Sequence, residues 1–299
     1  MIYLKVDIDT FRGTEKGVPN LLRLFAEENV SASFFATLGA DESGKALKRI
    51  FKKGFIKKMF RTNAVKLYGI KTMLYGTLLP APIISKKLAE TLKKIELEGH
   101  ELGIHSWNHV KWQDNLDSMT ENQIDLELNK ALSSYSALTG HKPYGFAAPA
   151  WKINETALKS LLKCDFRYLS VARGQKPAYI KIGDIVSDII EIPTTMPTLD
   201  EILAWDNMTP EKALQYLTDT PKKNNLNVFT LHSEVEGMAY LDFFKNLIVN
   251  WKKKGFSFKL LHQVSEDLKN NPQKYAVTEN PVEITFKNFL GRAQKLASV

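Results

Sequence analysis

The 299-residue sequence predicts an α/β fold with a mostly parallel sheet, either closed into a barrel or doubly wound. Short apolar stretches alternate with amphipathic helical stretches from residue 2 to residue 261. Three of the apolar stretches end in an acidic residue or a histidine. Functional sites of α/β folds lie at the carboxyl ends of the strands, where such residues are expected. The composition is that of a globular protein, with 44% hydrophobic and 25% charged residues. No run of about 18 apolar residues predicts a membrane-spanning helix.

The expected elements follow from residue spacing and from the signals at their ends. Residues 2–8 are apolar and β-branched and lead into a polar pair, which predicts a buried strand. Residues 17–29 carry a proline near the first turn, and residues 120–138 open with a Thr-x-x-Gln capping box. The same criteria predict strands at 30–38, 100–104, 168–171, 189–192, 227–231 and 257–261, and helices at 86–98, 157–163, 210–222 and 240–254.

Cysteine usage and the first residues favour a cytoplasmic protein. Cys164 is the only cysteine, so no intrachain disulfide can form. The first ten residues contain no charged stretch followed by an apolar one, so no secretory signal is expected.

Asp7 and Asp9 lie at the carboxyl end of the first predicted strand. Side chains two residues apart in a strand point to the same side, so two carboxylates would lie together at the edge where α/β folds place their sites. Their mutual repulsion would be relieved by a cation. A polar strand end whose aspartates cap the next turn is the competing interpretation.

His105 and His109 follow the short strand at 100–104 in the stretch HSWNH. On a helical turn this spacing puts both imidazoles on one face, about 5–6 Å apart, which suits one metal ion. Two exposed histidines are the simpler alternative. With Asp9 they form a set of two imidazoles and one carboxylate that leaves coordination positions open for water and substrate.

His232 directly follows the strand expected at 227–231. A structural histidine at a strand end is common, but here three separate strands each finish in a ligand or an acid–base group. This recurrence predicts one site at one edge of the sheet.

These residues resemble the polysaccharide deacetylase (NodB-homology) family, whose members share a distorted (β/α) barrel. The Asp-x-Asp of VDID is similar to the first family motif, HSWNH to the metal motif, and Leu231-His232 to the late Leu-His motif. The resemblance implies an amide hydrolase in which Asp7 is the catalytic base and His232 the general acid. It implies that Asp9, His105 and His109 hold one divalent transition metal ion, for which the donor set suits Zn, Co, Ni, Mn or Fe.

Within the family, the stretches VDIDTFRGTEKGVP, RTNAVKLYG, IPTTMPTLDE and LHSEVEG resemble the branch that deformylates undecaprenyl-phosphate-linked 4-deoxy-4-formamido-L-arabinose. That branch frees the amino sugar used in lipid A modification, which underlies resistance to cationic peptides. The resemblance implies a polyprenyl-phosphate-linked sugar as substrate. Trp151, Glu234 and Arg12 are the expected substrate-binding residues.

The family pattern is incomplete at two places. The third motif usually has an arginine shortly before a proline, but residues 146–151 read FAAPAW. The fourth usually offers an aspartate, where YLSVARG has Val171. Arg173 is the expected replacement for the missing arginine, as a catalytic residue paired with Asp7.

The implied chemistry suits an amide. Binding to a divalent ion lowers the pKa of water from about 16 toward about 7. Asp7 would take the proton from the attacking water, and His232 would protonate the departing amine.

The net charge of +8 comes from one segment, residues 43–89, which contains twelve Lys or Arg residues and no Asp or Glu. The rest of the chain therefore carries −4. Apolar residues fall on one helical face of this segment, as in helices that lie on anionic lipid. Nucleic-acid binding and plain packing are the rival interpretations, and with a lipid-linked substrate implied, no nucleic acid is expected. The expected membrane-docking residues are Lys52, Lys53, Phe55, Lys57, Lys58 and Phe60.

We therefore expect a catalytic domain at 1–269 that contains the basic insertion at 43–89, followed by a polar tail at 270–299. The enzyme is expected to be cytoplasmic and peripheral on the inner face of the inner membrane. One alternative is a deacetylase of another N-acetyl sugar or glycan. A lipid- or glycan-binding module without catalytic activity is the alternative of a different class, supported by the two incomplete motifs.

Overall fold

The computed structural model describes residues 1–46, 71–278 and 280–299. Its main feature is a ten-stranded sheet in the order β10-β6-β7-β5-β4-β3-β2-β1-β8, with β9 also pairing with β1. Within this sheet β6 and β7 pair antiparallel, and the other pairs of described strands are parallel. The strands are β1 (Ile2–Ile8), β2 (Ser33–Thr37), β3 (Glu101–Ser106), β4 (Gly145–Ala147), β5 (Tyr168–Ser170), β6 (Ala178–Ile182), β7 (Ile185–Glu191), β8 (Val228–His232), β9 (Phe258–Lys259) and β10 (Val282–Glu283).

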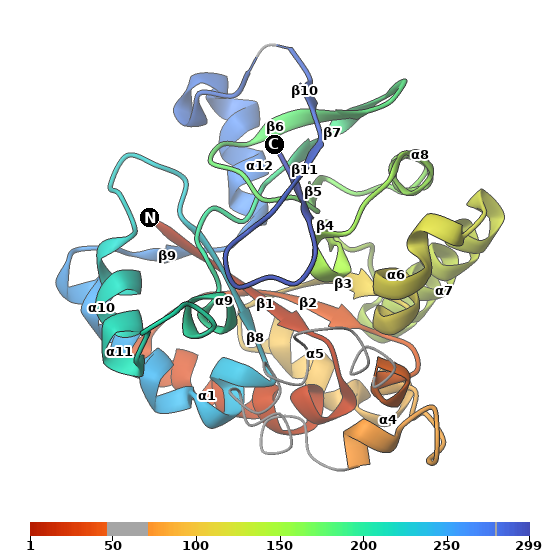
Figure 1. Cartoon of the computed structure of the whole chain (residues 1–299), viewed down its shortest axis with the longest axis horizontal. Helices are drawn as coiled ribbons and strands as arrows, with labels where there is room; N and C mark the ends of the chain where they lie inside the picture. The colour runs from red at the N-terminus through yellow and green to blue at the C-terminus, as the bar shows by residue number, and fades with distance from the viewer. Residues whose placement is uncertain (47–70, 279) are drawn as a thin grey trace.

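Helices surround the sheet (Figure 1). Along the outside, α10, α11, α1, α5, α7 and α8 each contact the next. This arrangement confirms the predicted α/β fold with a mostly parallel sheet, although the hydrogen-bonded strand path of the described residues stays open between β8 and β10. The helices are α1 (Val18–Glu28), α4 (Ile84–Lys87), α5 (Ala89–Leu97), α6 (His109–Asn115), α7 (Glu121–Thr139), α8 (Glu155–Leu162), α9 (Leu199–Leu203), α10 (Pro210–Asp219), α11 (Leu241–Lys253) and α12 (His262–Asn270).

Both faces of the sheet are buried at strands β1 to β5, and β1 shows how its residues divide between the two faces. Every residue of β1 is buried. Ile2, Leu4, Val6 and Ile8 belong to the large apolar core that also contains the helix side chains. Tyr3 belongs to a second, smaller apolar cluster. Because side chains alternate along a strand, Lys5 and Asp7 share the face of Tyr3, and β1 carries a polar row through the interior of the protein.

The last residues of the chain are part of the folded body. β12 (Leu296–Ser298) pairs with β11 (Thr285–Lys287), and its residues are buried. The Arg173 amide donates to the Ala297 carbonyl, and the Val299 amide donates to the Arg173 carbonyl. Residues 285–299, the last part of the segment 270–299 that was expected to be an appended tail, thus pack against the loop that follows β5.

Replacing Leu296 with alanine is expected to lower the free energy of unfolding by about 2–5 kcal/mol, because this side chain is 1% exposed and its loss leaves a cavity. Leu290→Ala is the matched control, since Leu290 lies in the same segment but is 71% exposed. Urea denaturation of both variants measures the difference. Equal small losses would show that the segment contributes little to the core.

The proposed membrane-docking residues Lys52, Lys53, Phe55, Lys57, Lys58 and Phe60 lie outside the described residues. None of the helices that the structure describes is long and apolar enough to cross a bilayer. The described residues of the basic insertion are 43–46 and 71–89, and among them the Tyr75 ring lies edge-on to the Phe11 ring, with the two centroids 6.2 Å apart.

Candidate active site

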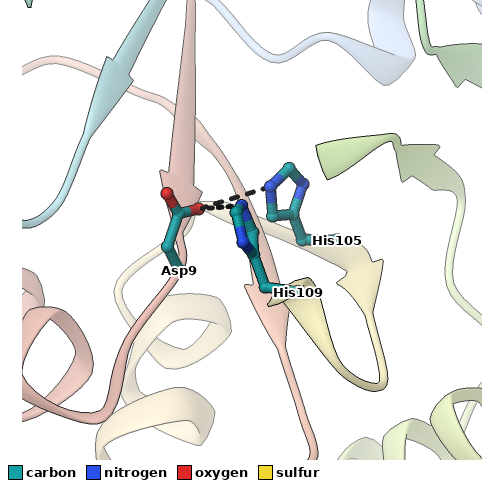
Figure 2. Close-up of side chains that lie close together, drawn as sticks. All are labelled: Asp9, His105 and His109. Atoms are coloured by element: carbon teal, nitrogen blue, oxygen red, sulfur yellow. Dashed lines mark ion pairs between the residues drawn. The ribbon is translucent and has the colours of Figure 1, made fainter. Parts of the chain in front are cut away.

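Asp9, His105 and His109 come together at the carboxyl edge of the sheet (Figure 2). Asp9 Oδ1 lies 3.3 Å from His105 Nε2 and 3.5 Å from His109 Nε2. One potential ligand atom from each residue lies within 4.8 Å of the other two. The three side chains that the sequence predicted as ligands therefore form a possible metal site.

The two imidazoles do not share a helical turn, contrary to the sequence interpretation. His105 belongs to β3, and His109 is the first residue of α6. The turn between them ends at Asn108, whose side chain accepts a hydrogen bond from the Lys111 amide and caps α6. This strand–turn–helix connection still places the ring centroids 5.3 Å apart, within the predicted spacing.

The donor set fits a divalent metal ion. His105 Nδ1 lies 2.9 Å from the Ala147 carbonyl oxygen, so the proton sits on Nδ1 and the lone pair of Nε2 faces Asp9. Within the described chain, the buried Oδ1 of Asp9 has no hydrogen-bond partner. Burial alone would raise the pKa of Asp9, but the positive charges of His109 and His105 in their protonated forms outweigh it and hold that pKa well below its usual range. A metal cation would take the place of those protons. An ionised carboxylate beside two nitrogen lone pairs is what a cation requires.

Asp7 lies on the inner face of β1 and is 4% exposed. Its Oδ2 is paired with Lys5 Nζ at 3.1 Å. Its Oδ1 is buried and has no hydrogen-bond partner among the described residues. In the paired strands Asp7 lies next to His232, so the predicted base and acid are neighbours across β1 and β8.

Arg173 does not pair with Asp7, and that expectation is corrected. Arg173 Nη1 lies 2.7 Å from Glu201 Oε1, and its other donors bond the Met196 and Thr194 carbonyl oxygens. A buried guanidinium needs such partners, and its Cζ lies 5.0 Å from the centroid of the Trp151 ring. The cation beside Asp7 is Lys5.

Glu234 is hydrogen-bonded to the backbone at Asp9, one of the three residues that could hold a metal ion. Its Oε1 accepts hydrogen bonds from the Asp9 amide, the Thr10 amide and the Thr10 hydroxyl, at 2.7–3.2 Å. Its Oε2 accepts from the Ser233 hydroxyl. Glu234 is 1% exposed, so its geometry supports holding the Asp9–Thr10 backbone and argues against the expected substrate contact.

The other two expected substrate-binding residues lie near the same edge. Trp151 is 2% exposed, and its indole donates to the Thr194 hydroxyl. Arg12 is half-buried, and its Nε has no hydrogen-bond partner among the described residues. Their contact with substrate stays a prediction.

Two short π-helices support the catalytic loops. η1 (Gly13–Gly17) follows Asp9, and η5 (Val235–Ala239) follows His232, and the two are in contact. A Cβ on Gly13 would lie 1.9 Å from Glu234 Oε1, and one on Gly17 would lie 2.0 Å from the Ser233 carbonyl oxygen. The glycines therefore allow the loops that follow Asp9 and His232 to pack together.

Two functional neighbours were missed from the sequence. Glu236 of η5 accepts the His232 amide at 2.9 Å, and burial raises its pKa to about 8. Lys5 had a visible signal, because a lysine in an otherwise apolar strand two residues before Asp7 must share the buried face of that aspartate. Glu236 had no comparable signal.

The comparisons agree with this geometry. Residues 1–169 match the sequence profile of the polysaccharide deacetylase family. The chain belongs to the polysaccharide deacetylase family. As a member it is a hydrolase of linear amide C–N bonds, as predicted.

Two relatives align with this polysaccharide deacetylase over most of their own length. One is a probable 4-deoxy-4-formamido-L-arabinose-phosphoundecaprenol deformylase, ArnD, of Shewanella sediminis (strain HAW-EB3), 39% identical over 85% of this chain and 82% of the relative. The other, from Wigglesworthia glossinidia brevipalpis and of the same description, is 30% identical over 87% of this chain and 91% of the relative. A crystal structure of a polysaccharide deacetylase candidate from Mycobacterium smegmatis covers 96% of this chain and 94% of its own, with a TM-score of 0.63. At 17% identity, that likeness shows the fold alone.

Proposed function

We propose that this enzyme hydrolyses the formamide of undecaprenyl-phosphate-linked 4-deoxy-4-formamido-L-arabinose, giving formate and the free aminoarabinose lipid for lipid A modification. The observation that carries the proposal is the Asp9, His105 and His109 set beside Asp7 and His232, in a chain 39% identical to an ArnD deformylase over most of its length. Asp9, His105 and His109 would hold one divalent transition metal ion. Such an ion supplies water activation at neutral pH and polarisation of the amide carbonyl.

Two proton transfers are needed, and Asp7 and His232 each carry out one of them. Asp7, through its uncommitted Oδ1, takes a proton from the water that attacks the formyl carbon. His232, across the strand pair, gives a proton to the nitrogen as the C–N bond breaks. The products are formate and the amine. Glu234 and Glu236 hold the backbone of Asp9 and His232 in place during both transfers.

We also propose that the enzyme is cytoplasmic and docks on the anionic inner-membrane surface through the basic insertion at 43–89. Its twelve cationic residues, with no acidic residue among them, suit an anionic bilayer. A substrate anchored by a polyprenyl chain is presented at such a surface, so docking would bring the metal site to it.

Mass spectrometry of the lipid-linked formamido sugar in liposomes, after incubation with metal-loaded protein, tests both statements. We expect loss of the formyl group, with faster turnover in liposomes that contain anionic lipid. The N-acetyl analogue is the control for substrate class, because preferential deacetylation would favour the alternative of a deacetylase. No hydrolysis of either substrate would favour a binding module without activity. Equal rates on neutral and anionic liposomes would remove the docking proposal and leave the activity in place.

A further inference from the structure

Lys5 is a fully buried cation in the middle of the sheet. Its side chain is 0% exposed, and it points to the inner face of β1. Taking an ammonium group out of water is costly unless a partner compensates. The partner is Asp7, whose Oδ2 lies 3.1 Å from Lys5 Nζ.

Two aromatic rings enclose the ammonium group of Lys5. Nζ lies 5.2 Å from the centroid of the Trp151 ring and 5.8 Å from that of Phe35. Both distances allow attraction between a cation and the face of a ring. Together with the carboxylate of Asp7, the rings restrict where the ammonium group can lie.

The Trp151 ring is itself held in place. Its Nε1 donates to Thr194 Oγ1 at 3.1 Å, and Thr194 Oγ1 is 2.7 Å from Thr230 Oγ1. Thr230 lies beside Lys5 in the pairing of β8 with β1. The indole of Trp151 is therefore linked through Thr194 and Thr230 to β8, which pairs with β1, the strand that carries Lys5. These contacts hold the Trp151 ring in place, and the ring together with Asp7 can hold Lys5 Nζ at a defined position.

We propose that Lys5 is a positioning residue that fixes the orientation of the Asp7 carboxylate. The ammonium group engages Oδ2, which leaves Oδ1 as the oxygen without a partner in the described chain and free to accept the proton of the attacking water. Without Lys5 the carboxylate loses its fixed partner, and the rate of proton transfer falls because the acceptor atom is no longer held in line. This inference rests on the proposed role of Asp7 as the base.

Lys5→Met tests the proposal, because it keeps the length of the side chain and removes its charge and its donors. We expect kcat for deformylation to fall about 100-fold, within the range attributed to a positioned base, while KM changes by less than about threefold. Metal content should equal that of the wild type. Lys5→Arg keeps the positive charge, so its kcat should be at least about tenfold higher than that of Lys5→Met. Lys259→Met is the control, since Lys259 lies on the neighbouring strand β9 and is half-buried.

A double-variant cycle with Asp7→Asn gives a readout that does not depend on turnover. Each single variant leaves one buried charge unpaired, so we expect the double variant to lower the urea midpoint by less than the sum of the two single losses. If Lys5→Met does not fold, Lys5→Gln takes its place in both measurements.

The outcomes separate this inference from the proposed function. A wild-type kcat in Lys5→Met, with activity abolished in Asp7→Asn, would overturn the inference and leave the function intact. Absence of turnover in the wild type would refute the proposed substrate, and strictly additive urea shifts would then still refute the Lys5–Asp7 pairing.

Discussion

The Asp9→Ala variant is expected to bind no metal ion, and its rate of deformylation should be at least about 1,000-fold lower than that of the wild type. Asp9 Oδ1 lies within 3.5 Å of both imidazole nitrogens and is the one anionic ligand of the set. Two neutral imidazoles alone bind a divalent ion weakly, because a catalytic site of this kind uses three protein ligands. Metal content by elemental analysis and product formation by mass spectrometry measure the two effects.

The control for Asp9→Ala is Asp188→Ala, which removes an exposed carboxylate from β7. That variant should keep wild-type metal content and turnover. Full activity of Asp9→Ala at saturating metal would contradict the ligand assignment. Loss of activity with metal fully retained would mean instead that Asp9 acts directly on the substrate.

Gly17→Ala is expected to lower the free energy of unfolding by about 1–3 kcal/mol or more, as overpacking does. The backbone of Gly17 has φ −69°, which alanine adopts without strain. The added Cβ, however, would lie 2.0 Å from the Ser233 carbonyl oxygen, so η1 and η5 must separate. Because η1 follows Asp9 and η5 follows His232, metal affinity and kcat should fall together with stability.

Gly99→Ala gives the comparison for Gly17→Ala. A Cβ on Gly99 meets nothing within 4 Å, so the cost there is only that of placing alanine at φ +81°. Gly99→Ala should therefore leave metal affinity unchanged, whereas Gly17→Ala should not. Chemical denaturation measures the stability of both variants, and metal titration measures their metal affinity. Equal metal affinities would show that contact between the π-helices does not shape the site.

The sequence predicted Asp9, His105 and His232 as site residues because each one lies at or just beyond the end of a strand. Parallel strands bring their carboxyl ends to one edge, so Asp9, His105 and His232 could be placed together without knowledge of the loops. The same reasoning failed for the local geometry of His109, which begins a capped helix. A four-residue spacing does not distinguish one helical turn from a strand that passes through a tight turn into a helix.

The partner of Asp7 could not be predicted with the same reasoning. Arg173 was chosen because it lies close in sequence to the place where a motif is incomplete. Its environment is set by Glu201 and by β12, segments that are distant in the chain. The C-terminal segment was likewise interpreted as a tail because its composition is polar, yet Leu296 and Ala297 are buried. Contacts of this kind depend on the packing of distant segments, which local composition does not report.

The position of β8 beside β1 has a consequence for how an active molecule forms. The three proposed metal ligands all lie within the first 109 residues, whereas Glu234 accepts a hydrogen bond from the Asp9 amide across 225 residues of chain. Parallel pairing over so long a separation is intrinsically slow, because the entropy of closing the loop is lost before the contacts form. A chain in the course of folding can therefore acquire a metal-binding half before the strand that carries His232 has been inserted. We therefore expect metal binding by Asp9, His105 and His109 to precede completion of the site by His232 during folding.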